Sequence, residues 1–251
     1  MSLNSTTKVV IGHRLWVKLT HWIGTISFLL LLYTGVTILK AHPRLYWGDA
    51  GNDLTPALFE LPISKNYKHG GWENKTAFYE TKDSPVSASR TFDIYNQNGW
   101  GRSLHFLSAW VLVFTGIIYL LFAIFSGHIK RHLWLKSNEF SLRLFLKDMA
   151  DHLRLKIVQV TGGPQYGPLQ KTTYLLVLFL LIPLIILTGL TMSPAVTAAY
   201  PFLLKIFFGA QSARTIHFFA AALLTLFLLV HIIMIIRTGF KKQMISMTIG
   251  K

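Results

Sequence analysis

The chain has 251 residues, of which 52% are hydrophobic and 14% are charged, and its mean hydropathy is +0.44. This composition is typical of an integral membrane protein. The absence of cysteine excludes disulfides, thiolate-bound iron–sulfur clusters and thioether-attached haem. The net charge of +15 comes from basic residues that flank apolar stretches, so we expect membrane lipid and not nucleic acid as a partner.

Four apolar stretches are long enough to cross a bilayer: about residues 19–39, 103–127, 172–192 and 215–236. The first is too long for the apolar region of a signal peptide and no small-residue cleavage site follows it, so we expect a retained anchor. The sequence therefore predicts an all-α fold, a polytopic membrane four-helix bundle in which residues 1–251 form a single domain.

The segments between the spans differ in character. Residues 40–102 are polar, carry seven of the ten acidic residues and are rich in aromatics, which favours an ordered lid or docking surface. The loop 128–171 has eight Lys or Arg residues against three acids, and its stretch 139–157 has apolar residues at helical spacing, which predicts an amphipathic surface helix. Pro194 and Pro201 break the run 192–208, which we interpret as a short helix or turn.

Charge distribution predicts the orientation of the chain. With four spans, the basic loop 128–171 and the basic C-terminal residues Arg237, Lys241 and Lys242 lie on the same side. The positive-inside rule places that side, and both termini, in the cytoplasm. The acid-rich segment 40–102 then faces outward.

Histidines in the last span suggest a cofactor. His217 and His231 are 14 residues apart, so in a helix they fall within ~40° of one face and ~21 Å apart along the axis. Imidazole is an axial ligand of haem iron. A lone histidine near a helix end is more often an interfacial or satisfied core residue, so the interpretation depends on partners at matching depths.

Two other spans supply such partners. His21 lies at the cytoplasmic start of the first span, at the depth of His231, and His105 lies at the outer start of the second span, at the depth of His217. This pattern predicts an inner haem b held by His21 and His231 and an outer haem b held by His105 and His217. Because both axial positions are filled, such haems carry single electrons and do not activate oxygen.

Further residues fit the same hypothesis. Lys18, Arg102 and Arg214 each precede a predicted ligand by three residues, where a cation can pair with a haem propionate, although snorkelling to lipid headgroups explains each of them equally well. Gly35 and Gly116 lie within the first two spans. Glycine there usually marks a close helix contact, but a flat macrocycle against the backbone requires the same missing Cβ.

Several motifs resemble a known family: THW at 20–22, GRSLHF at 101–106, YGPLQKTTY at 166–174, LTGLTMSPAV at 187–196 and SARTIHF at 212–218. They are similar to the four-helix dihaem cytochrome b subunits of formate dehydrogenase, nickel–iron hydrogenase and thiosulfate reductase, and are closest to the thiosulfate-reductase-like branch. The resemblance covers nearly the whole chain outside residues 41–95. The family's ligand pattern is one histidine on each of the first two helices and two on the last, and the four histidines above meet it.

The resemblance also implies a quinone site beside the inner haem. Related subunits read Tyr-Asn-x-x-Gln-Lys before the third helix, and Tyr166, Gln170 and Lys171 match that pattern. Gly167 stands in place of the asparagine. The family's hydrogen bond to a quinone carbonyl is therefore expected from Gln165 or Gln170.

We accordingly predict a dihaem b-type subunit of the bacterial inner membrane. It would carry electrons between the quinone pool, on the cytoplasmic side, and a periplasmic redox enzyme, with a molybdopterin enzyme among the candidates. Two alternatives are a free-standing haem b membrane oxidase or reductase and a transporter that uses the histidines as a proton relay without haem. A passive anchor for a peripheral enzyme leaves the four matched histidines unexplained.

Overall fold

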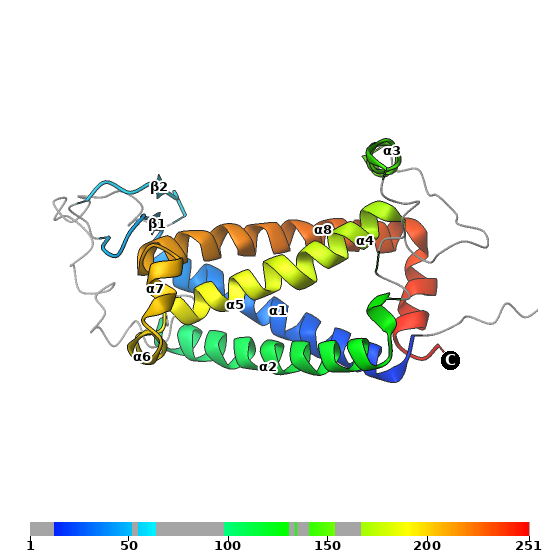
Figure 1. Ribbon diagram of the computed structural model, residues 1–251, viewed down its shortest axis with the longest axis horizontal. Helices are drawn as coiled ribbons and strands as arrows, with labels where there is room; N and C mark the ends of the chain where they lie inside the picture. Colours follow the sequence, from blue (N-terminus) through cyan, green and yellow to red (C-terminus); the bar gives the residue numbers. More distant parts are fainter. Residues whose placement is uncertain are drawn as a thin grey trace, which may run out of the picture. The chain divides into compact units, whose positions relative to one another are not determined.

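The computed structural model describes residues 13–51, 55–63, 98–130, 134, 141–153 and 167–250 (Figure 1). Within them, four helices are long and apolar enough to cross a membrane: Leu15–Ala41, Gly99–Phe125, Pro168–Thr191 and Ala210–Met247. The predicted all-α membrane bundle is thereby confirmed. Residues 64–97 lie outside the described part of the chain, and most of the predicted lid or docking surface lies there with them.

The elements follow one another along the chain as α1 (Leu15–Ala41), β1 (Arg44–Leu45), β2 (Phe59–Glu60), α2 (Asn98–Phe125), α3 (Leu142–Leu153), α4 (Pro168–Leu176), the π-helical turn η6 (Val177–Leu181), α5 (Ile182–Thr191), α6 (Pro194–Ala199), α7 (Phe202–Ile206) and α8 (Ala210–Met247). The two strands pair antiparallel, with Arg44 opposite Glu60. α3 lies in the stretch predicted to be amphipathic, and α6 and α7 lie in the proline-broken run.

The chain forms two compact units. Unit 1 comprises residues 1–24, 114–177 and 226–251, and unit 2 comprises residues 25–113 and 178–225. α1, α2 and α8 each contribute one part to unit 1 and the other part to unit 2. Each unit is therefore built from pieces of several helices.

Most buried side chains of the long helices are small or carry a hydroxyl group, whereas many large apolar side chains are exposed. The buried polar side chains of the long helices include Ser27, Thr34, Thr37, Ser108, Thr115, Thr188, Thr191 and Thr215. Large residues such as Phe114 and Ile124 are each 60% exposed. This distribution suits helices surrounded by lipid, because lipid solvates the large apolar side chains and small residues allow the helices to approach closely.

The third spanning helix changes its winding before Pro183. The π-helical turn Val177–Leu181 separates α4 from α5, and Pro183 is the second residue of α5. Proline lacks an N–H, and its ring clashes with the carbonyl group four residues earlier, so a wider turn at this point relieves the conflict.

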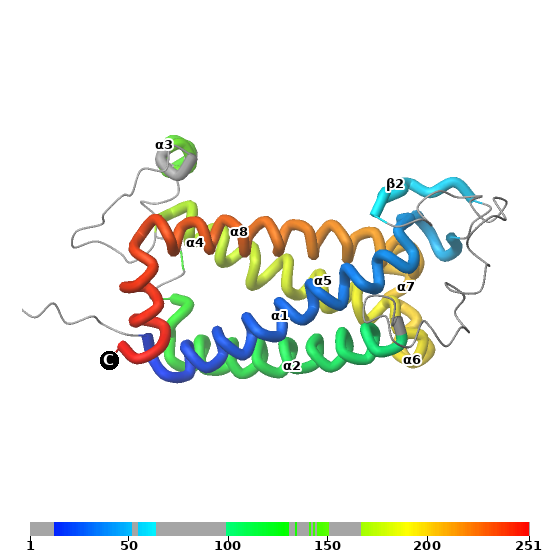
Figure 2. Tube along the Cα trace, turned by 180° about the vertical axis from the view of Figure 1, so that it is seen from behind, coloured from blue at the N-terminus to red at the C-terminus, as the bar shows by residue number. Residues whose placement is uncertain are grey.

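In unit 1, the C-terminal part of the chain returns to the start of α1. α8 breaks at Gly239, where φ is 106° and ψ is 86°, and the residues after the break run beside the first turns of α1 in both views (Figures 1 and 2). The indole Nε1 of Trp22 donates to the Met247 carbonyl at 3.0 Å. Lys18 Nζ donates to the Thr248 carbonyl at 3.2 Å and also to that of Gly250. The end of the chain is thus tied to α1 beside His21.

In unit 2, the segment that follows α1 is tied to the first turn of α8. The Gly48 carbonyl accepts hydrogen bonds from the backbone N–H groups of Gln211 at 3.0 Å and Ser212 at 3.2 Å. In return, the Gly48 N–H donates to Ser212 Oγ at 2.6 Å, and Thr215 Oγ1 donates to the Tyr46 carbonyl at 2.6 Å. The N–H groups of a helical first turn have no partner within the helix, so this segment serves as the N-terminal cap of α8.

We predict that Gly209→Ala destabilises the protein more than Gly48→Ala does. Both glycines have a positive φ, +108° and +101°, which costs an alanine about 1–2 kcal/mol. A Cβ at Gly209 would also lie 2.4 Å from the Gly48 carbonyl, whereas a Cβ at Gly48 would meet nothing within 4 Å. The apparent melting temperature of the full chain in detergent should therefore fall further for Gly209→Ala. Equal losses would show that this close approach does not matter for stability.

Candidate functional site

His21 and His231 face one another inside unit 1. Their ring centroids are 6.4 Å apart, with 51° between the ring planes, and the rings come from α1 and α8. Trp22 meets the His21 ring edge-on, with centroids 5.4 Å apart and an angle of 88°. Phe227 stacks on the His231 ring at 5.9 Å and 20°. Both imidazoles are therefore held in place by aromatic neighbours.

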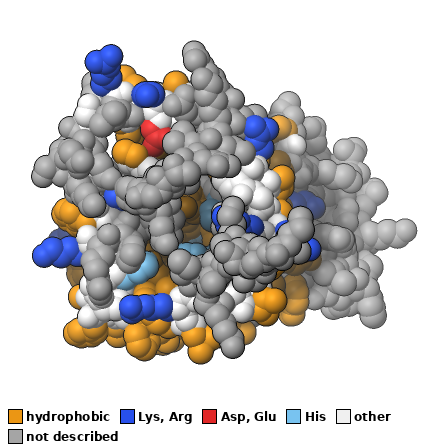
Figure 3. Space-filling model, turned by 90° about the vertical axis from the view of Figure 1, so that its right-hand side faces the viewer, with side chains coloured by type: hydrophobic (Ala, Val, Ile, Leu, Met, Phe, Trp, Pro, Cys, Tyr) orange, Lys and Arg blue, Asp and Glu red, His pale blue; other side chains and the backbone are white. Residues whose placement is uncertain are grey.

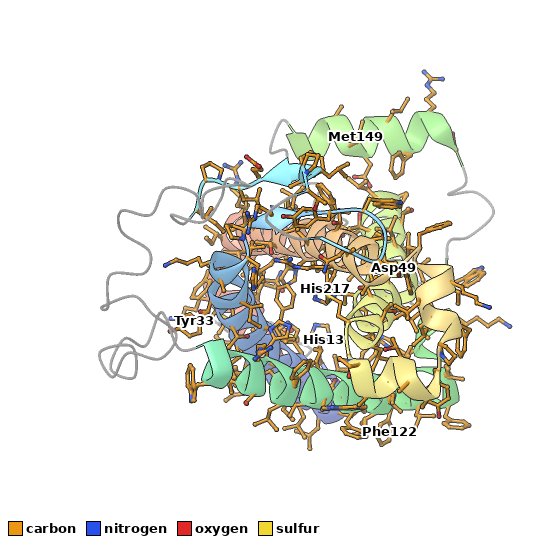
Figure 4. All side chains as sticks on the ribbon, turned by 90° about the vertical axis from the view of Figure 1, so that its left-hand side faces the viewer. His13, Tyr33, Asp49, Phe122, Met149 and His217 are labelled. Carbon is orange, nitrogen blue, oxygen red and sulfur yellow. The ribbon has the colours of Figure 1, made fainter. Side chains whose placement is uncertain are left out.

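His105 and His217 face one another inside unit 2. Their ring centroids are also 6.4 Å apart, with 56° between the planes, and the rings come from α2 and α8. His217 points inward, toward the other helices (Figure 4). Nδ1 of His105 lies 2.9 Å from Thr34 Oγ1, and Nδ1 of His217 lies 3.0 Å from Thr188 Oγ1. Neither threonine was among the residues predicted from the sequence.

The separation within both pairs fits a haem iron. With about 2 Å from metal to each imidazole nitrogen and about 1.1 Å from nitrogen to ring centroid, two opposed axial rings would have centroids about 6.2 Å apart. Both pairs lie close to that value. In the part of the chain that the structure describes, no group of three or more His, Cys, Asp or Glu side chains could hold a metal ion. Two histidines can fill only the two axial positions of an iron. A macrocycle such as a porphyrin would have to supply the remaining nitrogen ligands.

The glycines near the histidines have different surroundings. A Cβ added to Gly35 would lie 3.6 Å from Cε1 of His105, and one added to Gly189 would lie 3.5 Å from Cε1 of His217. Gly35 therefore lies beside the ring of His105, a predicted ligand. Gly189 lies in the same way beside the ring of His217, and sequence reasoning missed it. A Cβ on Gly116, in unit 1, would meet nothing within 4 Å, so a macrocycle could approach the backbone of α2 there.

Two of the three basic residues predicted to pair with propionates, Lys18 and Arg214, make hydrogen bonds to backbone carbonyls. Lys18 binds the C-terminal carbonyls described above. Arg214 Nη2 donates to the His42 carbonyl, and Arg102 is exposed on the first turns of α2. Pairing of these three cations with propionates stays a prediction.

His13 lies outside the spans. Burial lowers the pKa of His13 most, and the charge of Lys18 lowers it further, so we expect its ring to be neutral at pH 7.

The residues predicted to form a quinone site are described only in part, because Tyr166 and Gln165 lie outside the described residues. Gln170 Oε1 accepts a hydrogen bond from the Gly167 N–H at 3.2 Å at the start of α4, and Lys171 is buried. Asp148 of α3 accepts from the Leu169 N–H at 3.0 Å. A Cβ on Gly167 would lie 2.9 Å from the Asp148 carboxylate, so glycine there allows α3 to cap α4.

Contacts among aromatic rings link α4 to the histidine pair of unit 1. Tyr174, one helical turn after Gln170, meets Phe227 edge-on, with centroids 6.1 Å apart and an angle of 85°. Phe227 in turn stacks on His231. The first turns of α4 therefore lie one aromatic layer away from a predicted haem ligand.

Comparison with known proteins identifies the family of the chain. The model of the family described as prokaryotic cytochrome b561 matches residues 12–250. A protein of Azospira oryzae named "Putative protein-methionine-sulfoxide reductase subunit YedZ1" is 28% identical over 223 residues, which are 89% of each chain. No solved structure gave a significant match. The predicted resemblance to cytochrome b subunits is confirmed, and haem b binding follows from the family. The chain belongs to the prokaryotic cytochrome b561 family, and it is a multi-pass membrane haem protein of electron transport.

Proposed function

We propose that the chain binds two b-type haems and passes single electrons from one to the other. The observation that supports this most directly is the presence of two separate histidine pairs with the same centroid separation, 6.4 Å. His21 and His231 would hold the inner haem, and His105 and His217 the outer haem. When bound, haem supplies one-electron oxidation and reduction at its iron.

The chain's own residues favour electron transfer over the alternatives. Two histidines per haem would leave no coordination position for oxygen, which argues against a free-standing oxidase. A proton relay without haem needs histidines within reach of water or of one another, but it does not require two pairs at a metal-bridging separation. Trp22 and Phe227 cover the imidazoles of one pair, so they would exclude water and keep the rings in one orientation.

We further propose that a quinone reacts beside the inner haem. Gln170 and Lys171 lie on the first turn of α4, which packs through Tyr174 and Phe227 toward His231. Gln170 would donate its amide N–H to a quinone carbonyl while its oxygen keeps the bond to Gly167. Tyr166 would complete the site. Protons would then be exchanged with the cytoplasm.

The proposed orientation places both termini in the cytoplasm of a bacterial cell. Figure 3 views the molecule from the side on which the C-terminus lies in Figure 1, and Lys and Arg side chains recur over the described surface there while acidic ones are rare. Positive charge beside membrane spans is typical of the cytoplasmic side. Arg102 and Arg214 would then lie near the outer haem.

A redox enzyme on the outer face would exchange electrons with the outer haem. The name of the Azospira oryzae relative makes a reductase of protein methionine sulfoxide the first partner to test, and a molybdopterin enzyme is compatible with the family resemblance. The segment 40–102 and the nearby arginines would form the docking surface for this enzyme.

We predict that His217→Ala and His231→Ala each remove a different haem. The purified wild type should contain two haems b per chain, and each variant should retain one, because each substitution removes an axial ligand of one site only. Haem per chain is measured from the pyridine haemochrome spectrum, and a redox titration should show a different surviving component in each variant. His42→Ala, outside the spans, is the control and should keep both haems. A folded variant that keeps two haems or loses both would contradict the assignment.

We also predict that quinones reoxidise the reduced protein in liposomes. Stopped-flow absorbance should show haem oxidation on addition of a soluble ubiquinone or menaquinone analogue. Gln170→Ala should slow this reaction at least tenfold with both haems retained, because it removes a carbonyl-binding amide. Thr172→Val, whose hydroxyl bonds only to its own helix among the described residues, is the control and should react at the wild-type rate. Failure of every quinone to oxidise the wild type would exclude the quinone reaction.

A further inference from the structure

The same four-residue pattern occurs twice in unit 2. Residues 34–37 of α1 read Thr-Gly-Val-Thr, and residues 188–191 of α5 read Thr-Gly-Leu-Thr. In each copy the first threonine contacts a histidine of another helix, and the glycine faces the same ring. α1 holds His105 of α2 in this way, and α5 holds His217 of α8. The two copies therefore serve opposite members of one histidine pair.

The hydroxyl groups help to determine which ring nitrogen carries the proton, together with backbone hydrogen bonds from His105 to Leu31 and from His217 to Ile185. Thr34 Oγ1 lies 2.7 Å from the Leu30 carbonyl, and Thr188 Oγ1 lies 2.7 Å from the Leu184 carbonyl. A carbonyl can only accept, so each hydroxyl uses its single proton there. Its oxygen is left as an acceptor for Nδ1–H of the histidine. The proton is thereby kept on Nδ1, and Nε2 has its lone pair available to bind iron.

The glycines lie beside the same rings. A Cβ added at Gly35 would lie 3.6 Å from Cε1 of His105, and one added at Gly189 would lie 3.5 Å from Cε1 of His217, which is ordinary van der Waals contact. Each imidazole therefore has a glycine about one methyl group away and a threonine hydroxyl at hydrogen-bond distance from Nδ1.

The last threonine of each copy is a natural comparison. Thr37 and Thr191 are buried, and their hydroxyls bond to carbonyls of their own helices, at 3.1 Å to Tyr33 and 2.8 Å to Leu187. No contact with a histidine is found for either of them in the described part of the chain. They match Thr34 and Thr188 in residue type, helix and burial, but not in their neighbours.

We propose that Thr34 and Thr188 are positioning residues that fix the tautomer and the ring orientation of His105 and His217, and so set the reduction potential of the haem between them. The proposal rests on the proposed function, which places that haem in unit 2. A hydrogen bond from Nδ1–H makes the imidazole a stronger donor, which favours ferric iron and lowers the potential. Thr34 and Thr188 contact His105 and His217, which belong to the same pair, so we expect the effect at one haem.

The test is a redox titration of the purified full chain, followed by visible absorbance and by electron paramagnetic resonance of the ferric haems. Thr34→Val and Thr188→Val should each raise the midpoint potential of one of two haem components and shift one of two low-spin signals, with the other unchanged. Thr34→Ser and Thr188→Ser keep the hydroxyl and should restore both readouts. Thr37→Val and Thr191→Val should match the wild type.

The outcomes separate this proposal from the proposed function. A wild type with fewer than two haems per chain would overturn the proposed function, whatever the threonine variants do. Two haems whose potentials and signals are unchanged in both valine variants, or are changed as much in Thr37→Val, would overturn the positioning role alone. If a valine variant binds no haem in unit 2, the serine variant decides: haem retained with serine supports the role of the hydroxyl, and haem lost with serine contradicts it.

Discussion

The structure depends on the pairing of each α8 histidine with a histidine of another helix. An imidazole within a membrane span is costly unless its nitrogens are satisfied, and in the proposed arrangement a haem iron would satisfy one nitrogen of each ring in a pair. The two pairs have the same centroid separation although they lie in different units and have different neighbours. The proposed coordination of one haem iron by each pair would account for this agreement, because the packing around the two pairs is different.

Much of the remaining packing supports the two pairs. Threonines and glycines line the interior where α1 and α5 approach the histidines of unit 2, and the hydroxyls satisfy both their own helices and the rings. Both ends of α8 are tied down, by Gly48 and Ser212 at its start and by Trp22 and Met247 near its end. The second of these contacts lies beyond the break at Gly239, so it ties the C-terminal part of the chain to α1 beside His21.

Sequence reasoning identified the spans and the four histidines because both signals are local. Apolar length predicts a span, and a separation of 14 residues places two side chains on one helical face whatever the neighbours are. It did not identify Thr34, Thr188 or Gly189, since an isolated threonine in a helix normally bonds to its own backbone, as Thr37 does. The repeated Thr-Gly-x-Thr pattern was the available signal. The spacing of Lys18 also did not indicate its hydrogen bonds to the C-terminal carbonyls, and its pairing with a propionate stays a prediction.

The sequence alone thus determined the fold class, the family and the candidate ligands, because hydrophobic length and helical period are properties of a single segment. Only the tertiary structure decided which hydroxyl faces which ring, that Gly35 lies against His105, and that Asp148 caps α4 beside Gly167. Each of these contacts joins two helices that are distant in sequence. Such contacts depend on how the helices are rotated and displaced relative to one another, which no single segment encodes.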